Sequence, residues 1–208
     1  MYRVVDEDKY YDCISQLFSM ALFHRIHLVT ITDTIAKSDL IEDIEKDKYD
    51  IILNNSTKDI FIHLFPSAFI LDEYKTKFDE GYWCGYVYMN LFYHFKKPFS
   101  YLFLKLPLTK LLDMYEVFHQ MDISQMYIEF ERIEKENTIM ELLLIKNKMS
   151  ITRLSKISKV PIRTISYYKK SDYNLYKGSY ENIRRIAIAL EVSNNLFINS
   201  VPIINYEY

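Results

Sequence analysis

The side chains best placed to recognise a ligand lie in one stretch, SITRLSKISKVPIRTISYYKK, which spans residues 150–170. Its apolar residues are spaced as in two short helices joined by a three-residue turn, the helix-turn-helix arrangement that reads DNA. The chemistry expected of such a unit is hydrogen bonding and apolar contact with base edges of double-stranded DNA. The residues that the second helix would present to a groove are Ile162, Arg163, Thr164, Ser166 and Tyr167.

Local signals define the two helices that must hold this face. The hydroxyl of Ser150 can accept a hydrogen bond from a free backbone N–H and so cap the first helix. The turn follows at residues 158–160. Pro161 has the fixed backbone angle of a first helical turn, so the second helix is expected to start around it. The residues whose spacing places them on the buried side are Leu154, Ile157, Val160, Ile165 and Tyr168.

Three segments together resemble the lambda-repressor-like (Cro-type, XRE) family of helix-turn-helix domains from phage and bacterial regulators. They are the apolar helix MELLLIKNKM, the unit SITRLSKISKVPIRTISYYKK and the segment SYENIRRIAIALEVSNNLF, within residues 139–197. The resemblance implies a domain of five helices that reads DNA as a two-fold dimer. It also implies that Ile162, Arg163 and Tyr167 contact bases. Arg163 would bond a guanine in two places, and Ile162 would touch a thymine methyl group.

The same resemblance implies contacts to the DNA backbone. Lysine and arginine side chains pair with phosphates, and free N–H groups at the start of a helix bind them as well. The residues assigned to phosphates are Ser150, Ile151 through its backbone N–H, Arg153, Lys169, Lys170 and Lys177, with Lys156 and Thr164 as further candidates. The alternative is that these are ordinary solvated residues on a module used only for protein contact.

Several positions depart from the family pattern. The family often has glycine in the turn, after the reading helix and after the fourth helix, where this chain has Lys159, Ser171 and Glu191. Each is therefore expected to take a helix-end conformation at some energetic cost, because only glycine enters the left-handed region freely. An arginine common in the first helix of the family is replaced by Leu144, which removes one phosphate contact.

Charge divides the chain into two parts. Residues 1–136 hold 15 Lys and Arg against 23 Asp and Glu, whereas residues 137–208 hold 11 against 5. A basic back half joined to an acidic front half suits one module that touches phosphate and another that does not. We therefore expect an N-terminal domain over 1–136 for dimerisation, partner binding or sensing. A DNA-binding domain over 137–200 and a tail over 201–208 would follow.

Composition favours helices throughout. Half of the residues are apolar and only three are glycine, which leaves little material for the turns of a many-stranded sheet. The segments whose spacing or capping signals predict helices are 6–25, 33–46, 72–97, 108–119 and the residues after Ser56. The segment 72–97 is expected to be one long helix or two helices with a break near Gly81. The β-branched run at 26–32 is expected to be a short strand. The predicted fold is mainly α, with a small sheet in the N-terminal domain (α+β) as the alternative.

The front half offers little for catalysis or metal binding. His24 and His27 have ligand-like spacing, as do His119 and Asp122, yet no third ligand lies nearby in the sequence. We expect no metal, no cofactor and no catalytic residue, and thus no enzyme. If the chain were an enzyme fused to a DNA-binding domain, these histidines and Asp122 would have to lie close together in the fold. No segment resembles a signal peptide or a membrane helix, which predicts a cytoplasmic protein without a membrane partner.

Together these observations predict a sequence-specific transcriptional regulator of bacterial or phage type, most simply a repressor. The alternative is an antitoxin or a phage-encoded inhibitor. Its N-terminal domain would neutralise a partner protein while the helix-turn-helix regulates its own operon. A homodimer is expected, with Ile188, Phe197 and Ile198 as a candidate apolar seam. These three side chains would otherwise pack on the C-terminal tail.

Overall fold

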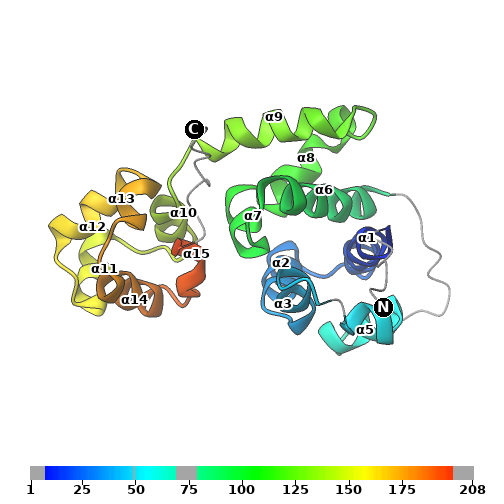
Figure 1. Cartoon of the computed structure of the whole chain (residues 1–208), viewed down its shortest axis with the longest axis horizontal. Coiled ribbons are helices and arrows are strands. Elements are labelled where there is room, and N and C mark those ends of the chain that lie inside the picture. Colours follow the sequence, from blue (N-terminus) through cyan, green and yellow to red (C-terminus); the bar gives the residue numbers. More distant parts are fainter. Residues whose placement is uncertain (1–7, 49, 69–78, 199–208) are drawn as a thin grey trace. The chain divides into compact units, whose positions relative to one another are not determined.

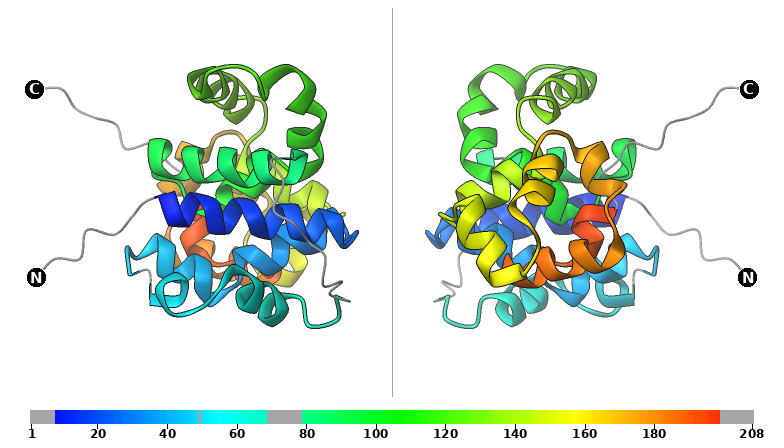
Figure 2. Two further views of the ribbon diagram at one scale, coloured as in Figure 1. Left: turned by 90° about the vertical axis from the view of Figure 1, so that its right-hand side faces the viewer. Right: turned by 90° about the vertical axis from the view of Figure 1, so that its left-hand side faces the viewer.

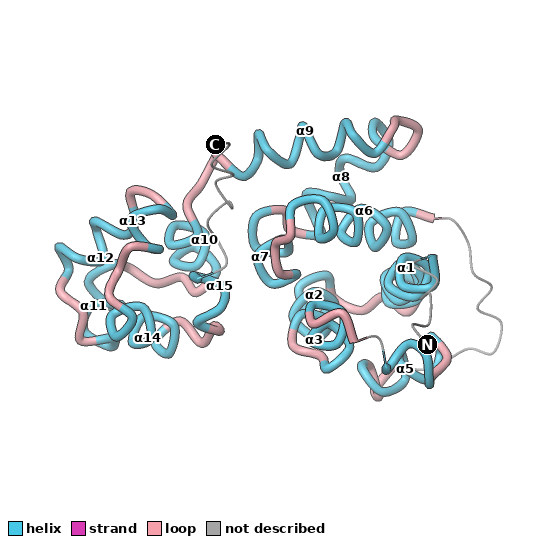
Figure 3. Tube along the Cα trace, viewed as in Figure 1, coloured by secondary structure: helices cyan, strands magenta, loops and turns pink. Residues whose placement is uncertain are grey.

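A computed structural model describes residues 8–48, 50–68 and 79–198 of the chain. Every regular element in these ranges is an α-helix (Figure 3), so the prediction of a mainly helical chain is confirmed. No strand forms among these residues, and the small sheet considered as an alternative is wrong for them. The tail at 201–208 and part of the helix predicted over 72–97 lie outside the described residues.

The chain forms two compact units, and Figure 1 labels most of their helices. The first unit consists of Met1–Phe99 and Pro107–Tyr127, and the second of Ser100–Leu106 and Ile128–Tyr208. The helices of the first unit are α1 (Asp8–Phe23), α2 (Leu28–Ala36), α3 (Asp39–Glu45), α4 (Asp50–Asn54), α5 (Thr57–Leu64), α6 (Glu80–Phe95) and α8 (Leu108–Phe118). The second unit contains most of α7 (Phe99–Lys105), the end of α9 (Ile123–Glu134), α10 (Ile139–Lys146), α11 (Ile151–Ser158), α12 (Ile162–Lys169), α13 (Asp172–Tyr176), α14 (Tyr180–Ala189) and α15 (Asn194–Ile198).

Helices α1 and α6 form the main pairing of the first unit and lie side by side in Figure 2. Two glycines of α6 let the two backbones approach closely. A Cβ atom at Gly81 would lie 2.7 Å from Ser19 Cα, and one at Gly85 would lie 2.6 Å from Ser15 Cα. Contacts this short essentially never occur between real Cβ atoms and a backbone, so the pairing requires glycine at both positions. The buried apolar residues of α1 include Tyr10, Ile14, Leu17, Phe18 and Ala21.

Residues 26–32, expected to be a strand, instead lead into helix α2. Ile31 and Ile35 are both fully buried, and four residues apart they share one face of a helix. Burial of this face outweighs the preference of β-branched residues for strands, which is worth about 1 kcal/mol or less per residue. The single helix expected over 33–46 is also two helices, because Ser38 caps the separate helix α3.

Polar side chains cap two further helices of this unit, α5 and α6. Ser56 Oγ accepts a hydrogen bond from the Asp59 N–H at 3.2 Å, so the capping signal before α5 is confirmed. Asp79 does the same for α6, where its carboxylate accepts from the Tyr82 N–H at 2.9 Å. Each cap satisfies one of the N–H groups that a helix leaves unpaired at its first turn.

Candidate nucleic-acid interface

Helices α11 and α12 pack against each other across a three-residue turn. Ser150 Oγ accepts a hydrogen bond from the Arg153 N–H at 3.2 Å, so the predicted cap of α11 is confirmed. Four of the side chains expected on the buried side are indeed buried, namely Leu154, Val160, Ile165 and Tyr168. The spacing of apolar residues in this stretch therefore predicts most of its buried side chains correctly.

Ile157 is the exception, since 49% of its surface is exposed. Ser158 takes the buried position instead, because it follows Leu154 by four residues on the same helix face. Its Oγ donates to Leu154 O at 2.7 Å and accepts from the Val160 N–H at 3.3 Å. Ser155 Oγ donates to Val160 O at 2.7 Å. Two serine hydroxyls therefore hold the turn through both backbone polar groups of Val160.

Helix α12 begins at Ile162, one residue later than the sequence suggests, with Pro161 at its N-cap. The Pro161 carbonyl accepts from the N–H groups of Thr164 and Ile165 at 2.9 and 3.1 Å, which closes the first turn. Proline has no side-chain acceptor, and no side chain caps this helix. The first N–H groups of α12 are thus left to solvent or to a ligand.

The five residues predicted to face a groove all retain accessible surface. Ile162 is 48% exposed and Tyr167 is 53% exposed. Arg163 between them is exposed as well, and Thr164 and Ser166 are half-buried. Helix α12 therefore presents an apolar, a cationic and an aromatic side chain from one accessible surface.

A shallow hollow of about 360 Å³ opens beside this face. Arg163 and Tyr167 line it from α12, and Lys177 and Ser179 line it from the segment that leads into α14. Helix α14 is ten residues long and is capped by Ser179. A guanidinium group, an ammonium group and a helix N-terminus each attract an anion. The hollow is suited to a phosphate group.

The residues predicted to hold phosphates differ in how available they are. Those with exposed side chains are Ser150, Arg153, Lys156, Lys170 and Lys177. Lys169 is half-buried, and its Nζ lies 3.3 Å from Glu141 Oε1, so a phosphate would have to compete with this ion pair. Lys177 Nζ lies 4.5 Å from the centre of the Tyr173 ring. Ile151 is the first residue of α11, where its backbone N–H has no partner within the helix.

Two of the three replaced glycines behave as the sequence predicts. Lys159 has φ 59° and Glu191 has φ 56°, both in the left-handed region. The expectation for Ser171 is wrong, because its φ of −166° is extended. Helix α13 starts directly after it, and Ser171 Oγ accepts from the Tyr173 N–H at 3.1 Å. This position therefore needs a capping side chain rather than a left-handed residue.

The candidate dimer seam is smaller than expected. Ile188 on α14 is 63% exposed, which leaves an apolar side chain in solvent. Phe197 is fully buried within the second unit and offers no surface to a partner. The Ile198 side chain lies outside the described part of the structure. Only Ile188 of the three candidates is therefore available among the described side chains.

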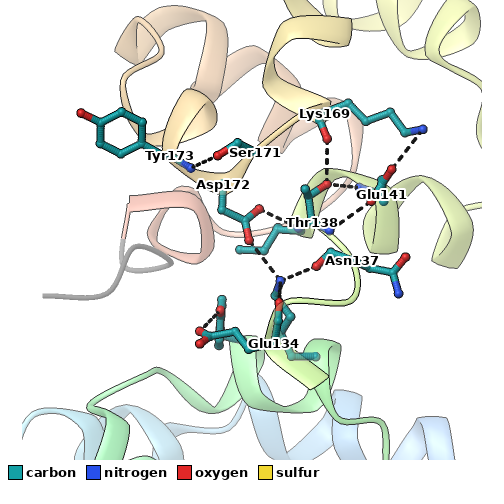
Figure 4. A network of polar contacts seen from close by, with 11 residues as sticks. Glu134, Asn137, Thr138, Glu141, Lys169, Ser171, Asp172 and Tyr173 are labelled. Atoms are coloured by element: carbon teal, nitrogen blue, oxygen red, sulfur yellow. Dashed lines mark hydrogen bonds and ion pairs between the residues drawn. The ribbon is translucent and has the colours of Figure 1, made fainter. Parts of the chain in front are cut away.

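A buried lysine that the sequence does not single out lies at the centre of a polar network in the second unit. The Lys105 side chain is 1% exposed, and its Nζ lies 3.0 Å from Asp172 Oδ2. The same Nζ donates to the carbonyl oxygens of Glu134 at 3.0 Å and Asn137 at 2.5 Å (Figure 4). These three acceptors match the three N–H bonds of an ammonium group.

Asp172 extends this network to the helices around α12. Its Oδ1 accepts from the Ile139 N–H at 2.8 Å, at the first residue of α10. Thr138 and Glu141 cap α10 reciprocally, and Thr138 Oγ1 also donates to Lys169 O at 3.1 Å (Figure 4). The start of α10 is thereby joined to the start of α13 and to the last residue of α12. The network positions the helix that carries the candidate reading face.

The histidines and cysteines of the first unit form no comparable site. No group of three or more potential metal ligands occurs within the described ranges. His24 lies 5.3 Å from the Phe61 ring, and His119 lies 4.4 Å from the Tyr115 ring, measured between centroids. Burial raises the pKa of the Cys13 thiol to about 11, which keeps it protonated and weakly nucleophilic near neutral pH.

Comparisons with protein-family models, curated proteins and solved structures give no match for this chain. The resemblance of residues 139–197 to lambda-repressor-like domains therefore stays a prediction. Among the described residues, no helix is long and apolar enough to cross a membrane. The features that favour nucleic-acid binding are the accessible face of α12 and the charge around it.

Proposed function

We propose that this protein is a DNA-binding transcriptional regulator in which α12 reads base edges in the major groove. The accessible face of α12 carries the proposal, because Arg163 is exposed there between Ile162 and Tyr167. A guanidinium can donate two hydrogen bonds to guanine, and an aliphatic side chain can contact a thymine methyl. Such contacts select a sequence, whereas contacts to phosphates fix position and supply much of the affinity.

The surroundings of α12 supply these phosphate contacts. The hollow between α12 and α14 combines Lys177 with the N-terminus of α14. Arg153 on α11 and Lys170 after α12 are exposed cations within the same unit. Residues 137–208 carry 11 basic against 5 acidic side chains, which favours approach to a polyanion. A regulator of this kind would bind as a two-fold dimer, with its reading helices about 34 Å apart. Ile188 is the candidate residue at the seam.

The experiment selects bound duplexes from a random library and then measures affinity for the selected sequence by fluorescence anisotropy. We expect the affinity to fall steeply between about 50 and 200 mM salt, since phosphate binding releases counterions. Arg163→Ala should weaken specific binding about 5- to 150-fold and relax preference at one base position. Lys177→Ala should weaken binding to all sequences alike and make the salt dependence less steep.

A charge-matched control separates base reading from general electrostatics. Arg132 on α9 is exposed and pairs with Glu129 on the same helix and with Glu136 just after its end. Arg132→Ala removes one positive charge, as Arg163→Ala does, without touching α12, and should leave the selected sequence unchanged. The proposal fails if the protein shows no salt-sensitive binding to duplex DNA. It also fails if Arg163→Ala binds the selected sequence as the wild type does.

A further inference from the structure

A second hollow, of about 650 Å³, lies on the first unit between α1 and α6. Tyr11 lines it from α1, and Tyr82 and Tyr86 line it from successive turns of α6. Asp8 and Asp12 from the first two turns of α1 complete its acidic side. None of these residues belongs to the unit that carries α12, so the proposed DNA contacts leave this hollow without a role.

The tyrosine rings present aromatic surface at the hollow. The Tyr11 and Tyr86 ring centres are 5.8 Å apart, with the planes inclined by 49°. Tyr11 also stacks on Tyr93, at 5.5 Å between centres. Tyr86 is 36% exposed, so part of its side chain stays accessible to a ligand. Aromatic faces carry partial negative charge and attract cations.

Asp12 supplies a full negative charge held in a fixed place. Its Oδ1 accepts from the Tyr82 hydroxyl at 2.9 Å, and its Oδ2 accepts from Gln16 Nε2 at 2.6 Å. A carboxylate has about four acceptor sites, so two hydrogen bonds orient it and leave capacity for a ligand. Burial and the neighbouring Asp12 raise the pKa of Tyr82 to about 12, so the phenol remains a donor at neutral pH.

The far wall of the hollow is also fixed in place. Asn90 Nδ2 donates to Tyr86 O at 2.8 Å, and Asn90 Oδ1 accepts from the Tyr127 hydroxyl at 3.2 Å. Among the described residues of the lining, Lys9 is the one cation, against the two carboxylates of α1. The lining is therefore net negative, and its carboxylates stand beside aromatic rings.

The same row of rings already holds a cation of this chain. Lys96 Nζ lies 5.2 Å from the centre of the Tyr93 ring, which stacks on Tyr11. The chemistry of this surface therefore suits an ammonium group. The excess of acidic residues in 1–136 adds a long-range attraction for cations.

We propose that this hollow binds an organic cation, with an ammonium or guanidinium group resting on Tyr86 and Tyr11 and paired with Asp12. The group could belong to a free amine or to a lysine or arginine side chain of a partner protein, since both present the same chemistry. The site extends the proposed function with a binding activity of the first unit, and it does not depend on DNA binding.

The test titrates the full-length protein by calorimetry with two probes at low salt. One probe is agmatine, a small molecule with one primary amine and one guanidinium group, and the other is the peptide acetyl-Gly-Arg-Gly-Lys-Gly-amide. Saturable binding is expected for at least one of them. Binding of agmatine alone indicates a small-molecule ligand, and binding of the peptide alone or far more tightly indicates a protein partner. A peptide with glutamine in place of arginine and lysine should not bind.

Substitutions in the lining test which side chains contact the bound cation. Tyr86→Leu and Asp12→Asn should each weaken binding about 3- to 10-fold, because one removes the aromatic face and the other the charge. The matched controls are Tyr180→Leu on α14 and Asp113→Asn on α8, whose side chains are exposed and lie outside the hollow. Circular dichroism checks that all four variants fold.

Two outcomes would overturn the proposal. One is that neither probe binds saturably, and the other is that Tyr86→Leu and Asp12→Asn bind the probes as tightly as the wild type. Arg163→Ala separates the DNA-binding proposal from the cation-binding proposal. It should impair DNA binding and leave binding of the two probes unchanged. Tyr86→Leu should do the opposite.

Discussion

Lys105 Nζ and Asp172 Oδ2 are 3.0 Å apart, although 67 residues separate the two side chains along the sequence. Removing an ammonium group from water is costly unless acceptors replace the lost water. Asp172 and two backbone carbonyls provide that replacement. Because Asp172 also binds the first N–H of α10, the pair determines how α10 and α13 meet.

Lys105→Met should destabilise the second unit by about 3 kcal/mol, because it leaves the carbonyls of Glu134 and Asn137 and one oxygen of Asp172 without their donor. Amide hydrogen exchange of α10 and α13 measures this loss, since exchange reports opening of individual helices. Combining Lys105→Met with Asp172→Asn should cost less than the sum of the two single changes. Strictly additive costs would show that the pair is not coupled.

Lys159→Gly should stabilise the second unit by about 0.5–1 kcal/mol. Lys159 has φ 59°, a conformation that glycine adopts without the strain caused by a Cβ atom. Lys156→Gly is the matched control, because it removes the same charge from the exposed interior of α11. It should destabilise the helix by about 1 kcal/mol. Urea unfolding followed by circular dichroism compares the two variants, and a loss of stability in both would contradict the prediction.

Gly85→Ala should destabilise the first unit by about 1–3 kcal/mol through overpacking. The new Cβ would lie 2.6 Å from Ser15 Cα and 2.8 Å from Ile14 O, and neither backbone atom can rotate away. Helix propensity alone predicts the opposite sign, since alanine favours a helix by about 1 kcal/mol over glycine. Fluorescence of Trp83, the single tryptophan, follows the unfolding of α6. A stabilised variant would show that α1 and α6 are less closely packed.

Acidification should reduce the contribution of Glu141 to stability. The carboxylate of Glu141 accepts a hydrogen bond from the Thr138 N–H and interacts with Lys169. The hydrogen bond, and to a lesser degree Lys169, holds the pKa of this carboxyl below its usual value of about 4.3. The ionised carboxylate therefore stabilises the fold above about pH 4.3, and this stability is lost as pH falls through the lowered pKa.

Glu141→Gln cannot ionise, so the difference in unfolding free energy between wild type and variant should shrink as the solution is acidified from about pH 6 to about pH 3. Urea unfolding at a series of pH values, with circular dichroism as the probe, measures this difference. A difference that stays constant or widens on acidification would contradict the assigned role of Glu141.

Features that depend on one helical turn could be predicted from the sequence. Ser56 and Ser150 cap their helices because the N–H groups that they bind lie three residues away. Ile165 and Tyr168 are buried because their spacing puts them on one side of α12. In each case, the interacting groups are close enough along the chain for spacing alone to bring them together.

Other features depend on packing that no local pattern contains. The β-branched run at 26–32 favours a strand by propensity, but burial of Ile31 and Ile35 makes it enter a helix. Ile157 follows the helical period almost as well as Ser158 does, and the small serine takes the buried place. Lys105 looks like an ordinary surface lysine, because its acceptors come from segments about 30 and 67 residues away.

The pairing of α1 with α6 also has a consequence for how the chain is made. Helix α1 is complete at Phe23, but its main partner is complete only at Phe95. At about 5–20 residues per second, the ribosome needs roughly 4–14 s to add the 72 residues between these two points. For that time the face of α1 that packs against α6 lacks its native partner, although α2, α4 and α5 are already complete. The nascent chain therefore passes through a stage in which a chaperone, or another nascent chain, can bind this face of its first helix.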